Sequence, residues 1–271
     1  MADKKLKACV TGVSGRLGRA IAAELIRRGD TELVGGMVSS DSAYLDADIG
    51  DMAGAGYLGL TACVALEDAA KDAAVVIDAS APHVTIAIAA RLAETGGPAL
   101  ATGVTGFDGA QQAALNAASA KFALLQASNF SLGVAVVERL IAEAAARLPA
   151  ELFDLEIGET HHKHKVDAPS GTALTLGRAA AAARGGDFDR LALYERPRTS
   201  ERRPIGAIGF TAVRGGGVVG EHAARFLADA EEISVGHRAF DRVIFARGAV
   251  EAALWLKGKP AGYYTMQDVI G

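Results

Sequence analysis

The sequence has few of the residues that mark secreted, metal-binding or membrane proteins. Only two cysteines, Cys9 and Cys63, occur among its 271 residues, and both lie within apolar stretches. They form no metal-type pair, and a structural disulfide is not expected in a chain without an export signal. No apolar run is long enough to span a bilayer, and the one after the basic N-terminus is too short for a signal peptide. We therefore expect a protein of the reducing cytoplasm with no membrane partner.

A strong excess of charge of either sign is also lacking. Lysine and arginine number 28 against 32 aspartates and glutamates, which gives a net charge of -4. Surfaces that bind nucleic acid or anionic membranes carry clustered basic residues, so we expect neither partner. An anionic substrate would instead have to meet a local basic pocket. A chain of this length can form two domains, each with its own hydrophobic core.

The first half of the sequence alternates short apolar runs with alanine-rich helical segments. Continuous apolar strands that alternate with helices are typical of a parallel sheet covered on both faces. The predicted class is therefore α/β, with a Rossmann-like parallel sheet. The strands are expected at 6–10, 32–38, 75–77, 99–101 and 122–125, and the helices at 15–28, 84–94 and 110–120.

The periodicity changes after 128–131. A longer helix is predicted at 133–147, and Phe153, Leu155 and Ile157 then alternate with polar residues. A period of two with one polar face indicates a sheet of antiparallel type. Further strands are expected at 207–213, 218–227 and 232–237, with a hairpin turn at 228–231.

A last helix, expected at 241–256, has no core of its own to join, so we predict that it returns to the first half. The predicted dinucleotide-binding domain is therefore 1–130 together with 240–271. The predicted substrate-binding and oligomerisation domain is 131–239, a smaller α+β domain with a mixed or antiparallel sheet.

A glycine-rich turn joins the first strand to the first helix. Here the chain must turn sharply, approach a pyrophosphate with its backbone and pack the helix against the sheet, and glycine permits each of these. The helix start then offers free N–H groups to the phosphates. A tight turn without a ligand is the alternative, but the strand before and the helix after favour dinucleotide binding. The predicted loop residues are Gly12, Val13, Ser14, Gly15, Arg16, Leu17 and Gly18.

The most informative stretch is HHKHKVDAPSGTAL, which starts at His161 and enters a helix near Ser170. It can be read as a metal site, as a solvated basic loop or as an anion site with a proton donor. Zinc sites usually have ligands spaced along a helix or cysteine partners, so we expect no metal. Lysine supplies a charge for a carboxylate, a helix start supplies N–H and hydroxyl donors, and histidine supplies a proton near neutral pH. The segment therefore contains the chemical groups needed to bind a dianion and to protonate it.

This stretch resembles the signature of the dihydrodipicolinate reductase family. Further blocks are similar to that family in the right order, so the resemblance covers essentially the whole chain. They are GVSGRLGR at the glycine turn, ATGVTGF at 101–107, SNFS at 128–131, GFTAVRGGGVVGEH at 209–222 and FARGAVEAALWL at 245–256.

The resemblance implies a reductase of lysine and diaminopimelate biosynthesis, usually a homotetramer. Hydride passes from a nicotinamide to the ring of a cyclic dicarboxylate, which gives tetrahydrodipicolinate. By matching position, His161 is the implied proton donor and Lys165 the partner cation. The implied substrate contacts are His162, Ser170, Gly171, Thr172 and Thr105. The remaining implied cofactor contacts are Gly103, Val104, Thr105, Ser128, Asn129 and Phe130.

Plainer interpretations remain open for several of these positions. His162 and His164 can simply orient the loop, Lys163 can be solvated, and Asp167 can cap the following helix. Arg214 with the glycines at 215–217 is expected to form a hairpin-like turn rather than a second phosphate loop. Two rival functions are an aspartate or homoserine dehydrogenase, which should lack the histidine–lysine block, and a catalytically silent NADP-sensing protein.

The end of the second predicted strand bears on cofactor choice. NAD-selective sheets of this kind carry an acidic residue there, which accepts hydrogen bonds from the ribose and repels the extra phosphate of NADP. Here the strand ends in Ser39 and Ser40, whose hydroxyls can donate to a phosphate, and Arg16 can add a charge. We therefore predict NADPH as the preferred cofactor and NADH as usable. If NADH is preferred, Asp41 is the expected ribose acceptor.

Overall fold

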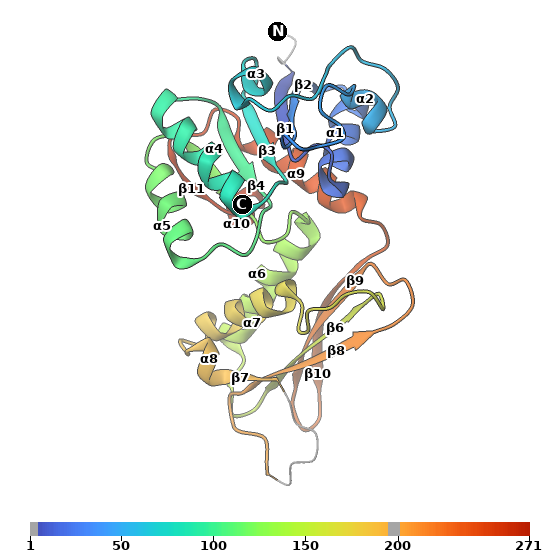
Figure 1. Cartoon of the computed structure of the whole chain (residues 1–271). Helices are drawn as coiled ribbons and strands as arrows, with labels where there is room; N and C mark the ends of the chain where they lie inside the picture. The colour runs from blue at the N-terminus through green and yellow to red at the C-terminus, as the bar shows by residue number, and fades with distance from the viewer. Residues whose placement is uncertain (1–4, 195–200) are drawn as a thin grey trace. The chain divides into compact units, whose positions relative to one another are not determined.

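The computed structural model describes residues 5–194 and 201–271 and divides into two compact units (Figure 1). The first comprises Met1–Ser131 and Val243–Gly271, and the second comprises Leu132–Arg242. Each has its own sheet and its own buried core. The first four residues of the N-terminus, considered above for a signal peptide, lie outside the described residues. None of the helices in the described ranges is long and apolar enough to cross a membrane.

The sheet of the first unit has six strands in the order β11-β5-β4-β3-β1-β2, and all neighbouring strands are parallel. The chain passes from β1 to β2 on one side of β1 and returns to β3 on its other side. Ligands of open parallel sheets bind beyond the carboxyl ends of the strands at such a reversal. The strands are β1 (Leu6–Thr11), β2 (Thr31–Met37), β3 (Val75–Asp78), β4 (Ala99–Thr102), β5 (Ala123–Gln126) and β11 (Gly262–Tyr264).

Helices cover both faces of this sheet, as expected from its continuous apolar strands. On one face α1 packs with α9, which also contacts β3, β4 and β5. On the other face, side chains of α3, α4 and α5 share a core with the strands. The helices of this unit are α1 (Arg16–Arg27), α2 (Ile49–Met52), α3 (Leu66–Ala70), α4 (Pro82–Thr95), α5 (Gly109–Ala118), α9 (Val243–Leu256) and α10 (Met266–Val269).

Local sequence accounts for the ends of these helices. Helix α5 starts at a capping box, in which the Asp108 side chain accepts from Gln111 N at 2.8 Å and the Gln111 side chain accepts from Asp108 N at 3.0 Å. Helix α4 has Pro82 in its first turn and ends at Gly96, whose φ of 65° is in the left-handed region that glycine adopts without strain.

The sheet of the second unit has five strands in the order β10-β9-β6-β8-β7. Helices α6 and α7 pack on one face, with Ile141, Leu155, Ile157, Leu176 and Phe226 in the shared core. The elements are α6 (Leu132–Arg147), β6 (Asp154–His161), α7 (Gly171–Ala183), α8 (Phe188–Leu191), β7 (Ala192–Leu193), β8 (Ile208–Arg214), β9 (Gly220–Leu227) and β10 (Glu232–Ala239).

The predicted fold class is confirmed, and the second sheet is mixed rather than antiparallel throughout. Strand β9 is antiparallel to β6 and β10, but β6 is parallel to β8. Alternating hydrophobicity shows only that one face is buried, so it cannot distinguish these pairings. The hairpin turn at 228–231 is confirmed, because Ala228 N donates to Glu231 O at 2.9 Å between paired strands.

The hairpin-like turn expected at 215–217 is wrong. Strands β8 and β9 do not pair with each other, because β6 lies between them. The glycine segment instead crosses the end of β6, where Gly215 N donates to His161 O at 2.9 Å and Gly216 O accepts from Lys163 N at 3.3 Å. The connection therefore holds the start of the histidine–lysine stretch in place.

Candidate active site

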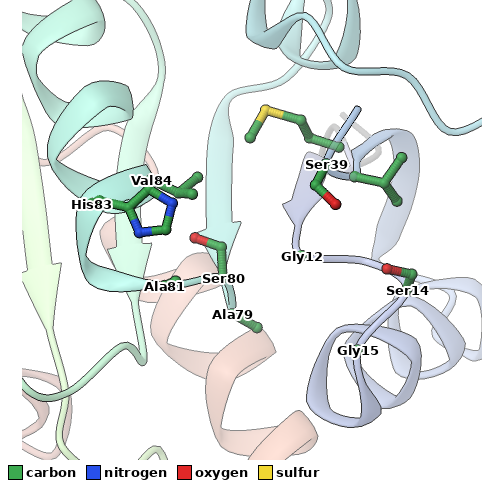
Figure 2. Close-up of a pocket in the computed structure, with 11 residues that line it drawn as sticks. Gly12, Ser14, Gly15, Ser39, Ala79, Ser80, Ala81, His83 and Val84 are labelled. Carbon is green, nitrogen blue, oxygen red and sulfur yellow. The ribbon is translucent and has the colours of Figure 1, made fainter. Parts of the chain in front are cut away.

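A pocket of about 330 Å³ lies at the carboxyl ends of β1, β2 and β3, where the strand order reverses (Figure 2). The glycine turn, the end of β2 and the start of α4 form its walls, and no lining side chain is acidic. Of the predicted cofactor residues, only Gly12, Ser14, Gly15 and Ser39 line it. The other lining residues are Met37, Val38, Ala79, Ser80, Ala81, His83 and Val84.

The glycines of the turn are required by close backbone contacts. Gly12 has a φ of +69°, and a Cβ there would lie 2.6 Å from Ala79 O. A Cβ at Gly18 would lie 2.2 Å from Gly12 O, so helix α1 can pack this closely only without a side chain. Gly15 is the N-cap of α1 and provides no side-chain cap, which leaves N–H groups of the helix start available to an anion.

Other predicted cofactor residues of the glycine turn lie outside the pocket lining. Val13 is buried, and Arg16 is exposed on the first turn of α1. Sequence reasoning missed Arg19, whose Nε donates to Ser14 O at 2.9 Å and whose guanidinium lies 4.4 Å from the centre of the Tyr44 ring. The arginine thereby fixes the backbone of the glycine turn.

A buried carboxylate that sequence reasoning also missed joins three strand ends beside the pocket. Asp78 is fully buried at the end of β3 and accepts hydrogen bonds from the hydroxyls of Thr11 (2.6 Å), Thr85 (2.6 Å) and Thr102 (2.9 Å). Ser80 donates to it from its hydroxyl at 2.5 Å and from its backbone N at 3.0 Å. The feature of the sequence that could have identified Asp78 is its place at the end of the apolar run VVID.

The segments after β4 and β5 pack on each other within the first unit. A Cβ at Gly103 would lie 2.4 Å from the Phe130 ring, and Phe130 is 2% exposed. Val104 is buried, and its backbone N donates to Thr102 Oγ1 at 3.2 Å. Asn129 Oδ1 accepts from Ser131 N at 2.8 Å. The remaining predicted residues here, Thr105 and Ser128, are exposed.

The serines after β2 are exposed, as a phosphate contact requires. The Ser39 side chain hydrogen-bonds to Asp41 and lowers the pKa of that carboxyl below its usual value. The Ser39 hydroxyl therefore already has an acceptor, and Asp41 lies outside the pocket lining.

In the second unit, His161 ends strand β6 and is only 9% exposed. Its Nδ1 lies 2.6 Å from Glu159 Oε2, and the described residues give its Nε2 no hydrogen-bond partner. Glu159 is 3% exposed and accepts hydrogen bonds from both terminal nitrogens of Arg214, at 2.6 and 2.7 Å. Burial raises the pKa of Glu159, but the hydrogen bonds from Arg214 and His161 outweigh burial, and the pKa is lowered.

Ser170 connects this group to helix α7. It is the N-cap, and its Oγ accepts from Ala173 N at 3.2 Å and lies 2.9 Å from His222 Nε2. The expectation that Asp167 caps this helix is therefore wrong. The His222 and His161 rings are 5.0 Å apart, edge to face. Burial, and then the neighbouring charge of His161, lower the pKa of His222 to about 4, so this ring is neutral at pH 7.

The remaining predicted site residues border the same group. Lys165 is half-buried, and its Nζ lies 2.7 and 2.8 Å from the oxygens of Asp167. His162 Nε2 lies 3.1 Å from Arg242 Nη2. Gly171 is exposed with nothing within 4 Å of a Cβ position, and Thr172 is half-buried beside it in the first turn of α7. Lysine and helix-start donors thus lie on the same short stretch as His161.

Sequence reasoning did not identify Glu159, Arg214 or His222 as part of this group. Arg214 and His222 lie within the block 209–222 noted above, whereas Glu159 precedes the histidine–lysine stretch, and the alternation along β6 gave it no distinction from other polar residues. Pairing puts them together, because His161 is in register with Arg214 on β8 and Glu159 with His222 on β9. Among the described residues, no group of three or more potential ligands is arranged to hold a metal ion.

Comparison with known proteins agrees with these features. A family model described as "Dihydrodipicolinate reductase, N-terminus" matches residues 6–130, and one described as "Dihydrodipicolinate reductase, C-terminus" matches residues 133–270. The chain is 43% identical over 269 residues to a 4-hydroxy-tetrahydrodipicolinate reductase of Caulobacter vibrioides, with 99% of this chain and 98% of that protein covered.

Solved structures share the fold at low sequence identity. A dipicolinate-bound dihydrodipicolinate reductase from Paenisporosarcina sp. TG-14 matches with a TM-score of 0.76 and 20% identity, over 96% of this chain and 97% of that one. An amine dehydrogenase from Mycobacterium smegmatis matches with a TM-score of 0.61 and 13% identity, over 97% and 95% of the two chains. The chain therefore belongs to the dihydrodipicolinate reductase family of NAD(P)H-dependent oxidoreductases, which act in lysine and diaminopimelate biosynthesis.

Proposed function

We propose that the chain reduces a cyclic dicarboxylate, 4-hydroxy-tetrahydrodipicolinate or its dehydrated form, to tetrahydrodipicolinate. Family membership supports the reaction class, and the dipicolinate in a relative of the same fold supports a ring with two carboxylates. The observation that carries the proposal is the setting of His161. One ring nitrogen is held by a buried carboxylate, and the other has no partner among the described residues.

We propose that the first unit holds the dinucleotide. The glycine turn has no room for side chains, the start of α1 offers N–H groups, and the pocket lining lacks acidic side chains. These features suit a pyrophosphate. The proposed contacts are the loop residues Gly12, Val13, Ser14, Gly15, Arg16, Leu17 and Gly18, the serines Ser39 and Ser40, and Gly103, Val104, Thr105, Ser128, Asn129 and Phe130.

In the second unit, we propose that cations and helix-start donors bind the carboxylates. Lys165 would exchange its exposed partner Asp167 for a substrate carboxylate. The backbone N–H groups of Gly171 and Thr172, at the first turn of α7, would bind the other. His162 is a further proposed contact in this unit, and Thr105 of the first unit is another. Ser170 is 2% exposed and its hydroxyl has two partners, so its contribution is to fix the helix start.

The bound nicotinamide supplies a hydride to a ring carbon conjugated with the ring nitrogen. The reduced ring then needs one proton, and we assign its delivery to His161 Nε2, which has no partner among the described residues. With Nδ1 facing Glu159, the proton lost from Nε2 leaves a neutral ring in a single tautomer, ready to be reprotonated from solvent. Lys165 stabilises the negative charge of the bound carboxylate throughout.

A turnover assay tests this function. NADPH oxidation is followed with the dicarboxylate substrate generated in the cuvette by a coupling enzyme, and pyridine-2,6-dicarboxylate serves as a competing mimic. We expect oxidation that depends on the substrate and is inhibited by the mimic. A chain that binds NADPH but leaves it unoxidised under these conditions would instead be a nucleotide-sensing protein.

We further propose that NADPH is preferred and NADH is usable. The pocket lining has no carboxylate to repel the phosphate of NADP, and Ser40 is exposed beside Ser39. Ser39→Asp should raise the KM for NADPH more than that for NADH, with Ser42→Asp as a control nearby on the same loop. A wild-type kcat/KM for NADH well above that for NADPH would contradict the preference and point to Asp41 as the ribose acceptor.

The assembly and compartment are also proposals. The family resemblance supports a homotetramer, which sedimentation equilibrium would distinguish from a dimer. The free Cys9 and Cys63 fit the reducing cytoplasm, and fractionation of cells that produce the protein tests this location.

A further inference from the structure

We propose that Glu159 is a positioning residue that holds both the proton donor and the start of the carboxylate-binding helix, with Arg214 fixing its orientation. The inference rests on the proposed function, because it assigns a role to a neighbour of His161 rather than to a group that touches the substrate. It goes beyond the histidine–lysine stretch, since Arg214 lies 55 residues from Glu159 in the sequence.

Both oxygens of Glu159 are fully used. Oε2 contacts His161 Nδ1 at 2.6 Å and accepts from Arg214 Nη1 at 2.7 Å. Oε1 accepts from Arg214 Nη2 at 2.6 Å and from Ser170 N at 3.1 Å. The four contacts come from three elements, namely strand β6, strand β8 and the N-cap of α7. One side chain therefore sets the distance between the proposed proton donor and the proposed carboxylate site.

The contact with Nδ1 decides which nitrogen of His161 can act on a ligand. An ionised Glu159 only accepts hydrogen bonds, so Nδ1 must carry a proton and Nε2 is the nitrogen that gains and loses one. The surroundings of Nε2 fit this assignment. A Cβ at Gly220 would lie 3.1 Å from Nε2, so the glycine leaves space beside the nitrogen.

Arg214 keeps Glu159 in the form and position that this arrangement needs. Its two terminal nitrogens bind both oxygens, which is the planar fork that guanidinium offers and that an ammonium lacks. The same Nη2 donates to Asp167 O at 2.5 Å. The arginine therefore ties the loop that carries Lys165 to the carboxylate that holds His161.

Glu159→Gln is the main test, because it keeps the size of the side chain and removes one acceptor. In either orientation the new amide group faces a terminal nitrogen of Arg214, and at the Oε1 position it also faces the N–H of Ser170, so these hydrogen bonds cannot all remain. We expect kcat to fall about tenfold or more and the KM for the dicarboxylate to rise, because both the acid and the helix start shift. The dissociation constant for NADPH should stay unchanged.

Glu156→Gln is the matched control. Glu156 lies on the same strand and also pairs with an arginine, Arg203, at 3.0 Å. Its side chain lies on the other face of β6, because positions 156 and 159 differ by an odd number of residues. This variant should lose an ion pair of the same kind without a change in kcat or KM.

A spectroscopic readout separates positioning from general loss of structure. With histidine labelled by ¹⁵N, the long-range ¹H–¹⁵N spectrum of the wild type at alkaline pH should show His161 as the Nδ1–H tautomer alone. Glu159→Gln should give a mixture of tautomers. His161→Gln provides both the assignment and the reference loss of kcat.

The outcomes distinguish this inference from the proposed function. If His161→Gln keeps near-normal turnover, the proposed proton donor is wrong, whatever Glu159 does. If His161→Gln loses turnover while Glu159→Gln keeps wild-type kcat, KM and tautomer, the positioning role alone is overturned. Should Glu159→Gln fail to fold, Arg214→Lys keeps the charge without the fork and should shift the same quantities in the same direction by less. Unchanged values in that variant overturn the role of Arg214.

Discussion

The buried carboxylate of Asp78 gives the sharpest stability prediction for the first unit. Asp78→Asn keeps the shape and changes one oxygen into an amide nitrogen. If Oδ2 is the atom replaced, the hydroxyls of Thr85 and Thr102 lose their acceptor and must turn. Thr85 can turn to Ala81 O, 3.2 Å away, and Thr102 can accept from the new amide. The bonds to Oδ1 remain but lose the charge of their acceptor.

The cost follows from the number of bonds affected. A hydrogen bond to a charged group contributes about 1.5–3 kcal/mol, and a neutral one about 0.5–1.5 kcal/mol. Two bonds to Oδ2 are remade as weaker ones, so the free energy of unfolding should fall by about 2–4 kcal/mol. By the scaling for proteins of a few hundred residues, that corresponds to a decrease in Tm of about 4–16 °C. NADPH should bind about tenfold more weakly, because Thr11 and Ser80 flank the pocket.

Differential scanning calorimetry and calorimetric titration with NADPH measure the two effects. Asp108→Asn is the control, because asparagine is as good an N-cap as aspartate and Asp108 is exposed at the start of α5. Its Tm and NADPH affinity should match those of the wild type. An Asp78→Asn protein that melts with the wild type and binds NADPH equally well would refute the reasoning.

Three further predictions concern the second unit. His161→Gln and Lys165→Gln should each lower kcat by about a hundredfold or more, with little change in NADPH affinity by calorimetry; near-normal turnover in both would contradict their roles. Gly220→Ala should lower kcat because the new Cβ lies 3.1 Å from His161 Nε2, whereas Gly158→Ala, with open space around its Cβ, should not. His222 has its pKa lowered to about 4 from 6.5, so the unfolded chain binds a proton that the native state excludes. The free energy of unfolding is therefore unaffected by His222 above pH 6.5 and falls by up to about 3 kcal/mol as the pH is lowered towards 4. Chemical denaturation of the wild type and of His222→Gln across this pH range should show a smaller decrease for the variant.

Hydrophobic patterning in the sequence was sufficient for most of the backbone. The strand predicted at 75–77 is Val75–Asp78, and the helix predicted at 133–147 is Leu132–Arg147. These segments are predictable because burial on both faces or on one stripe imposes a regular apolar pattern. Strand β11 (Gly262–Tyr264) was missed, since three residues are too few to show a period.

Side-chain partners could not be predicted in the same way. The histidine–lysine stretch indicated a proton donor and a cation, but the residues that hold His161 come from distant strands. Arg214 was placed in a turn of its own because β8 and β9 looked adjacent, and only the insertion of β6 between them brings the arginine onto Glu159. Strand order is set by long-range packing, which a local pattern does not report.

The two units rely on the same physical device at the ends of their strands. Asp78 ends β3, and Glu159 lies two residues before the end of β6, the central strand of the second sheet. Each carboxylate is almost fully buried, and each accepts hydrogen bonds from several elements that meet there. An ionised carboxylate suits this position because it only accepts, so every group around it must turn a donor inward. The segments that follow these strands are thereby held at the carboxylate, by Ser80 N at Asp78 and by Ser170 N at Glu159, and Nε2 of the buried His161 remains available to a ligand.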